Sequence, residues 1–202
     1  MAWIDLFHAD EGPGVGGRDG SDDHRGRSPP LWPGRLHRGG RSTAGVWAVA
    51  EARHAVQGHG APLSLGTFVN VAVHPDAAVA RDLVRGSAAL FAHFVSEGPH
   101  DVVPDDDRAV VERVRAAYDE AAHGLTTAGQ ATLLPDALLD RFAVVGSPEH
   151  CTTRLRELID LGLDRIIVVP GSRDADPDVL AASNEPFAAE VLPRLRTATG
   201  AG

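Results

Sequence analysis

Residues 142–171 read FAVVGSPEHCTTRLRELIDLGLDRIIVVPG, and this stretch decides the fold class. It begins with the apolar run 142–145 and closes with the apolar run 166–169, and neither run alternates apolar with polar residues. Strands that are buried on both faces have this composition. The amphipathic stretch between the runs predicts a helix. Two strands joined by one helix form a βαβ unit, so we expect them to run parallel with a right-handed crossover.

The helix between these strands carries boundary signals at both ends. Ser147 stands at the N-cap position, Pro148 follows at the first helical position, and Glu149 lies in the positive first turn. At the far end, Gly162 stands where a left-handed residue is needed, and Leu163 can fold back onto the last turn. These signals predict a helix between Ser147 and Gly162.

The rest of the chain predicts one further strand and several helices. Residues 63–73 are rich in β-branched side chains and predict a strand, whereas the polar segment 172–177 predicts a loop. Pro193 should bend the last helix. Apolar residues recur at helical spacing in residues 76–95, 104–125, 135–141 and 187–196.

Residues 1–47 differ from the remainder. They are dense in glycine, proline, arginine and aspartate and show neither helical nor strand periodicity. Such a segment buries too little apolar surface to offset its ordering entropy, so we predict a flexible N-terminal arm and a folded domain over residues 48–202. The glycines of residues 12–17 are not followed by a helix pattern, which argues against a nucleotide-binding turn.

Composition excludes several classes of function. The chain has 202 residues, enough for one domain, and a net charge of −9, which argues against nucleic acid or an acidic membrane surface as a partner. It has one cysteine, and it lacks lysine, which excludes Schiff-base chemistry. The histidines are not spaced as metal ligands, so we expect no metal site. No apolar run approaches the ~20 residues of a membrane span, and we expect a cytoplasmic protein.

Four motifs, taken in order, resemble the C-terminal part of the luciferase-like monooxygenase family, which includes coenzyme F420-dependent reductases and flavin-dependent monooxygenases. The resemblance covers roughly residues 48–196. The motifs are NVAVHPDAAVARDLV at 70–84, FAVVGSPE at 142–149, LGLDRIIVV at 161–169 and EVLPRL at 190–195. The resemblance implies a (β/α)8 barrel that binds FMN or F420 at the carboxyl ends of its strands, and hydride transfer or monooxygenation on a small molecule.

The chain is too short for the whole barrel that this resemblance implies. A (β/α)8 barrel takes about 250 residues, and only three strands are predicted here. We therefore expect an incomplete TIM-barrel-like α/β fold made of C-terminal βα units with parallel strands. The alternative function is that of a non-catalytic barrel fragment, acting as an interaction or oligomerisation module. An exposed sheet edge would serve either case as a homo-oligomer interface.

Cofactor-binding residues are expected at the carboxyl ends of the strands. Gly146 permits close approach of a ligand, and Ser147 begins a helix whose N-terminus suits a cofactor phosphate, unless Ser147 serves only as a cap. Arg173, which follows Ser172 after the last strand, is placed to clamp a phosphate or carboxylate, unless it is a solvated loop residue. His74 suits proton transfer, with a helix-start role as the alternative.

Two further features have a simpler structural interpretation. Cys151 lies in the first turns of a helix without a histidine partner fixed by spacing, so we predict a buried structural cysteine. Residues 105–107 are three aspartates that match the positive first turn of a helix better than a cation site. The sequence predicts no catalytic residue.

Overall fold

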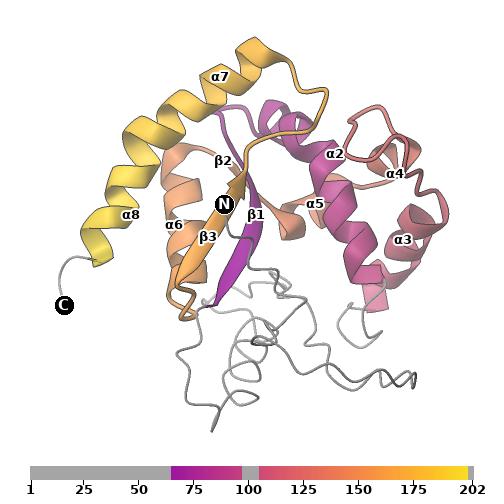
Figure 1. Cartoon of the computed structure of the whole chain (residues 1–202), viewed down its shortest axis with the longest axis horizontal. Coiled ribbons are helices and arrows are strands. Elements are labelled where there is room, and N and C mark those ends of the chain that lie inside the picture. The colour runs from indigo at the N-terminus through magenta and orange to yellow at the C-terminus, as the bar shows by residue number, and fades with distance from the viewer. Residues whose placement is uncertain (1–64, 97–104, 200–202) are drawn as a thin grey trace, which may run out of the picture.

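The computed structural model describes residues 65–96 and 105–199, in which three parallel strands carry helices on both faces (Figure 1). The strands are β1 (Gly66–Val73), β2 (Ala143–Gly146) and β3 (Arg165–Val169). They lie within one residue of the apolar runs at 142–145 and 166–169 and inside the predicted strand 63–73. Both β2 and β3 pair in parallel with β1, which confirms the parallel α/β fold.

The strand order is β2-β1-β3. The helix α6 (Pro148–Ile159) joins β2 to β3, and this connection passes over β1. The two connections therefore run in opposite directions across the sheet, and crossovers of the same hand then place their helices on opposite faces. Consecutive strands are neighbours in a (β/α)8 barrel. The described sheet thus has the parallel βα units of the expected partial barrel but a different strand order.

The two ladders of β1 overlap at a single residue. Residues 66–70 pair with β3, residues 70–73 pair with β2, and only Asn70 belongs to both. The sheet is therefore three strands wide only at Asn70. Beyond it, the Val73 N–H donates to Ser183 Oγ at 2.9 Å, so a side chain replaces the missing strand on that side of β1.

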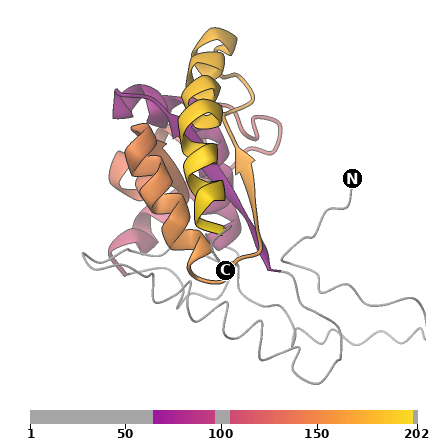
Figure 2. The ribbon, with the colours of Figure 1, turned by 90° about the vertical axis from the view of Figure 1, so that its left-hand side faces the viewer.

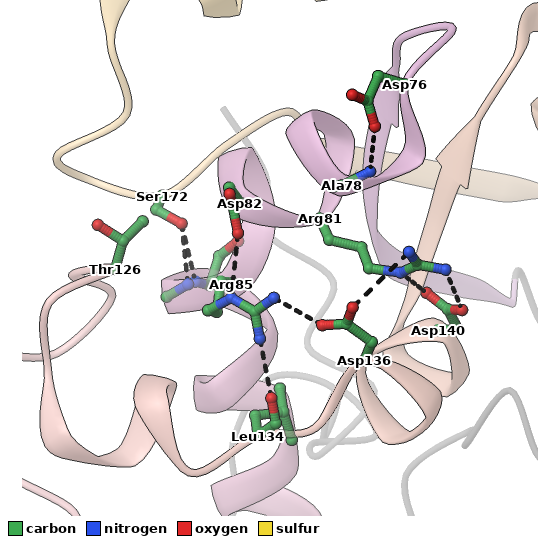
Figure 3. A network of polar contacts seen from close by, with 12 residues as sticks. Asp76, Ala78, Arg81, Asp82, Arg85, Thr126, Leu134, Asp136, Asp140 and Ser172 are labelled. Carbon is green, nitrogen blue, oxygen red and sulfur yellow. Dashed lines mark hydrogen bonds and ion pairs between the residues drawn. The ribbon is translucent and has the colours of Figure 1, made fainter.

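One face of the sheet is covered by α2 (Ala77–Ser96), α3 (Asp105–Ala116), α4 (Gly129–Thr132) and α5 (Asp136–Phe142). Two arginines of α2 fasten it to α5. Arg81 holds Asp140 through two hydrogen bonds of 2.8 Å, and Arg85 bonds Asp136 at 2.7 Å (Figure 3). The apolar core beneath these helices includes Ala72, Leu83, Val114, Leu139 and Val145.

The other face is covered by α6 and by a continuous helical run of α7 (Pro177–Pro186), η2 (Phe187–Val191) and α8 (Leu192–Thr199). Figure 2 shows α6 and this run side by side. The second core joins side chains from the sheet to these helices, namely Val69, Val71, Val73, Val144, Cys151, Leu155 and Val191.

The prediction of one helix over residues 104–125 was wrong for its second half. The helix α3 ends at Ala116, and the chain turns there. The buried side chain of Gln130 accounts for the difference. Its Nε2 donates to Asp119 O at 3.2 Å, and its Oε1 accepts from Asp119 N at 3.4 Å. Because Gln130 engages both backbone groups of Asp119, those groups are not available to a continuing helix.

The loop predicted at 172–177 is found, but the last helical run begins at Pro177, ten residues before the start expected at residue 187. Asp176 caps it by accepting from the N–H groups of Asp178 and Val179. Near Pro193, where the helix was expected to bend or weaken, the π-helical turn η2 ends two residues before the proline. The predicted arm at residues 1–47 and the glycines at 12–17 lie outside the described residues.

Candidate functional site

The end of β2 and the start of α6 form the first part of the candidate site. Ser147 is the N-cap of α6, as predicted, and its Oγ accepts from His150 N at 3.2 Å. Gly146 has a φ of +136°, and a Cβ on it would lie 3.4 Å from the ring of His150. The backbone conformation at this position therefore favours glycine, whereas a Cβ would make only ordinary van der Waals contact with His150.

The first turn of α6 offers few hydrogen-bond donors to a ligand. Pro148 has no N–H, and the His150 N–H is taken by the Ser147 hydroxyl oxygen. Among the described residues, the Glu149 N–H keeps no protein acceptor, and the Ser147 hydroxyl hydrogen can still be donated. These two groups can bind one anionic oxygen, although the Glu149 carboxylate in the same turn opposes a negative charge.

The loop between β3 and α7 forms the second part of the candidate site. Arg173 is exposed, its N–H donates to Gly124 O at 2.9 Å, and its Nη1 donates to His123 O at 2.7 Å. The guanidinium has further N–H groups that these contacts leave available. Arg173 is the only arginine in the described loops that directly follow the three strands.

Ser172 has a structural role beside Arg173. It is buried, its N–H donates to Leu83 O at 2.6 Å, and its Oγ accepts from Gly86 N at 2.9 Å (Figure 3). The close approach explains Gly86, because a Cβ there would lie 2.5 Å from Gly124 O. The loop after β3 is thereby held against α2.

Asp174 fastens the same loop to the segment that follows α3. Its carboxylate accepts from the Thr126 N–H at 2.8 Å and from the Thr126 hydroxyl at 2.8 Å. Burial by itself raises the pKa of Asp174, but these hydrogen bonds outweigh burial and hold the pKa below its ordinary value. A negative charge is thus fixed one residue from Arg173, which weakens the attraction of this loop for an anion.

His74 lies in the turn between β1 and α2. Its side chain makes only local contacts there, whereas its backbone N–H donates to Gly146 O at the end of β2 at 2.9 Å. Its Nδ1 accepts from Asp76 N at 3.0 Å, and Asp76 Oδ1 accepts from Ala78 N at 2.8 Å (Figure 3). The helix-start role of His74 is therefore confirmed. Within the described chain, the His74 ring hydrogen-bonds only to Asp76, so no second residue is placed to exchange a proton with it.

The two parts of the candidate site do not meet. Gly146 and Ser147 follow β2, Arg173 follows β3, and β1 lies between these strands. Two strand spacings separate the strands by about 10 Å across the sheet, and the two ends are also offset by three residues, about 10 Å, along β1. A single phosphate cannot bridge this distance, whereas an extended cofactor with two polar ends can.

Cys151 is the buried structural cysteine that was predicted. Its side chain is fully buried, and its Sγ lies 3.6 Å from Gly146 O and 3.8 Å from Val144 O. Burial raises the pKa of the thiol to about 11, so it stays protonated at neutral pH and is not a nucleophile. The helix-start prediction for residues 105–107 holds as well, and the carboxylate of Asp107 pairs with Arg141.

Sequence reasoning missed three contacts that shape this end of the fold. Ser183 binds the edge of β1, and Thr126 binds Asp174, and neither residue carries a local signal for its role. The ring of Tyr118 stacks on His93 at 3.7 Å between centroids, and its hydroxyl lies 2.8 Å from His123 Nδ1. Only the start of α7 had a readable signal, since Asp-Pro-Asp at 176–178 repeats the pattern of Ser-Pro-Glu at 147–149.

No helix in the described part of the chain is both long and apolar enough to cross a membrane. Within the same residues, no three side chains of histidine, cysteine, aspartate or glutamate gather as metal ligands do.

Comparisons with known proteins find a similar sequence and a similar solved structure. The chain is 26% identical over 104 residues to the 5,10-methylenetetrahydromethanopterin reductase of Methanolobus tindarius, a match that covers 49% of this chain and 31% of the relative. The solved structure of the coenzyme F420-dependent tetrahydromethanopterin reductase from Methanopyrus kandleri matches with a TM-score of 0.47 and 18% identity, over 74% of this chain and 42% of that one.

The chain thus spans less than half the length of either relative. The sequence profile of the luciferase-like monooxygenases matches residues 38–165, which is more than half of the chain. The chain belongs to the luciferase-like monooxygenase family.

Proposed function

We propose that this chain is part of an oxidoreductase that uses F420 or FMN to transfer hydride to or from a small organic molecule, or to oxygenate it. Family membership supports the reaction class. In such enzymes the cofactor supplies the redox chemistry, and the protein binds and orients it.

Gly146, Ser147 and Arg173 are the residues we assign to cofactor binding. The observation that carries this assignment is the carboxyl end of β2, where Gly146 keeps side chains away and the Ser147 hydroxyl and the Glu149 N–H remain free to donate. Arg173 would bind a second anionic group more than about 10 Å away, beyond the end of β3. The cofactor phosphate belongs at Ser147, because a helix N-terminus favours an anion.

Thermal unfolding of the whole chain with FMN and with F420 tests this assignment. A ligand at a hundred times its Kd adds about 2.7 kcal/mol to the free energy of unfolding, which raises Tm measurably. We expect one cofactor to raise Tm, and Ser147→Ala and Arg173→Gln to reduce that rise. Thr153→Ala is the matched control, because it removes an exposed hydroxyl six residues further along the chain, within α6. An equal reduction in all three variants would contradict the assignment.

The second candidate function is that of a non-catalytic module. The observation in its favour is that the anion site has few donors. One backbone N–H remains available in the first turn of α6, the Glu149 carboxylate repels an anion there, and Arg173 already binds His123 O. An unchanged Tm of the wild-type chain with both cofactors would support this candidate and refute cofactor binding. We propose a cytoplasmic location for either function, since the one cysteine is buried and forms no disulfide.

A further inference from the structure

The strand β3 lies at the edge of the described sheet, and among the described residues one side of it has no partner. The ladder that the structure describes for it is with residues 66–70 of β1. Within the described chain, no other strand or side chain bonds its outer backbone groups. Figure 1 looks onto this edge with β3 nearest to the viewer, and in Figure 2 β3 stands at the right-hand side of the sheet. The residues of β2 are all buried, whereas those of β3 are half-buried or exposed.

The side chains of β3 are apolar on both faces of the sheet. Ile166 and Val168 pack into the core under α6 and η2. By alternation, Ile167 and Val169 face the other side, and neither joins the described core beneath α2. An unpaired strand with apolar side chains on both faces is a template for pairing with another strand.

We infer that β3 pairs with β3 of a second copy of this chain, in antiparallel orientation about a two-fold axis at Ile167. A two-fold axis requires the same patch on both copies, and it makes the paired strands antiparallel. In this register Ile167 faces its own counterpart, and Ile166 faces Val168 of the second copy on the same face of the sheet. All of these are β-branched apolar pairs, which favour cross-strand packing.

The charges of β3 are compatible with this register. Arg165 is the only charged residue of the strand and is exposed. In the paired ribbon it faces Val169 of the second copy, and the two Arg165 side chains start about 14 Å apart along the strands. This exceeds the Debye length of about 8 Å at physiological salt, so their repulsion is screened. Parallel pairing would instead place the two arginines side by side.

The size of the interface predicts a weak dimer that does not grow into a filament. Five residues a side are far fewer than the ~20–30 of a standard interface, so association should depend on concentration. Once the two β3 strands are paired, the outer strands of the joint sheet are the buried β2 strands. The contact then closes at two copies, and it is independent of any cofactor.

Sedimentation equilibrium from about 1 µM to about 1 mM tests the pairing, a range that brackets weak association. We expect the mass of the wild-type chain to rise toward two copies. Ile167→Lys places two ammonium groups opposite each other and should abolish the rise. Leu133→Lys is the control, because Leu133 is a large apolar side chain, 38% exposed, outside the sheet. Equal loss in both variants, or a wild-type chain that stays monomeric throughout, would refute the inference.

A cross-linking experiment tests the register and does not depend on the lysine variant being folded. Opposing Cβ atoms in an antiparallel pair lie about 4.5–5.5 Å apart, close enough for a disulfide after small adjustment. Mild oxidation of Ile167→Cys should therefore give a covalent dimer, and Leu133→Cys should give none above background. The native Cys151 does not interfere because it is buried. Equal yields from the two variants would overturn the proposed register.

Discussion

The hydroxyl oxygen of Ser172 accepts a hydrogen bond from the backbone N–H of Gly86 at 2.9 Å, although the two residues lie 86 positions apart in the chain. The Ser172 N–H donates to Leu83 O in the same turn of α2 at 2.6 Å. Ser172, which follows β3, thus bonds the backbone of α2 as both donor and acceptor. Because β3 is an edge strand, this contact is one of the few that anchor its carboxyl end.

Ser172→Ala should lower the free energy of unfolding by about 1–3 kcal/mol, because it leaves the buried N–H of Gly86 without this acceptor. Urea denaturation monitored by circular dichroism measures the loss. Thr153→Ala is the control, since Thr153 is exposed and bonds only a carbonyl of its own helix. It should change the free energy by less than about 0.5 kcal/mol. A similar small change in Ser172→Ala would show that the contact contributes nothing to stability.

Gly86→Ala should destabilise the fold, although alanine is the better helix former by about 1 kcal/mol. The new Cβ would lie 2.5 Å from both Gly124 O and Leu125 C, and backbone atoms cannot move aside cheaply. We expect a net loss of about 1–3 kcal/mol, measured as a lower Tm and urea midpoint. Gly129→Ala is the matched control, because its Cβ would meet nothing nearer than 4.0 Å. A higher Tm for Gly86→Ala would refute the close approach.

Cys151 should resist thiol reagents in the native protein. Its pKa of about 11 leaves little thiolate at pH 7 to 9, and its side chain is fully buried. Reaction with a chromogenic disulfide should occur only at the rate of unfolding and should become fast in denaturant. Thr153→Cys introduces an exposed thiol two residues further along the chain and should react at once. Rapid native-state labelling of Cys151 would contradict its burial.

The pairing of Asp136 with Arg85 should make the fold sensitive to acid. The hydrogen bond from Arg85 lowers the pKa of Asp136, burial opposes this in part, and the charges of Arg85 and Arg81 lower it further. A pKa lowered by folding contributes stability above the ordinary carboxyl pKa near 4, and that stability is lost as the pH falls through the folded pKa. Urea midpoints should therefore fall below about pH 4.

Asp136→Asn tests this assignment because it removes the titrating group. The variant should be less stable than the wild type at pH 7 and should lose less stability on acidification. Arg85→Gln should flatten the acid dependence in the same way, since it removes the first donor to Asp136. An unchanged acid dependence in Asp136→Asn would show that other carboxylates govern acid unfolding.

The fold was readable from the sequence wherever local signals determine structure. The apolar runs 142–145 and 166–169 gave two strands, and Ser147 with Gly162 bounded α6, whose end carries the expected positive φ of 91° at Gly162. The strand order was not readable, because it depends on which surfaces meet after collapse. The end of α3 was not readable for the same reason, since the side chain of Gln130 determines it from a separate element.

The candidate site was predicted in its local chemistry but not in its arrangement. The cap at Ser147 and the helix-start role of His74 follow from residue type and spacing, and both are found. That Arg173 already binds His123 O, and that β1 separates it from Ser147, depends on contacts between distant segments. Short motifs carry no information about such contacts.

The central position of β1 has a consequence for synthesis on the ribosome. Asn70 bonds Phe142 at a separation of 72 residues, and Leu65 bonds Asp164 at a separation of 99. At about 5–20 residues per second, β1 emerges several seconds before β2 and longer still before β3. The central strand is thus translated first, and both of its partner strands are translated later. During that interval its protection must come from the nascent helices or from a chaperone, so yield in cells should depend on translation speed.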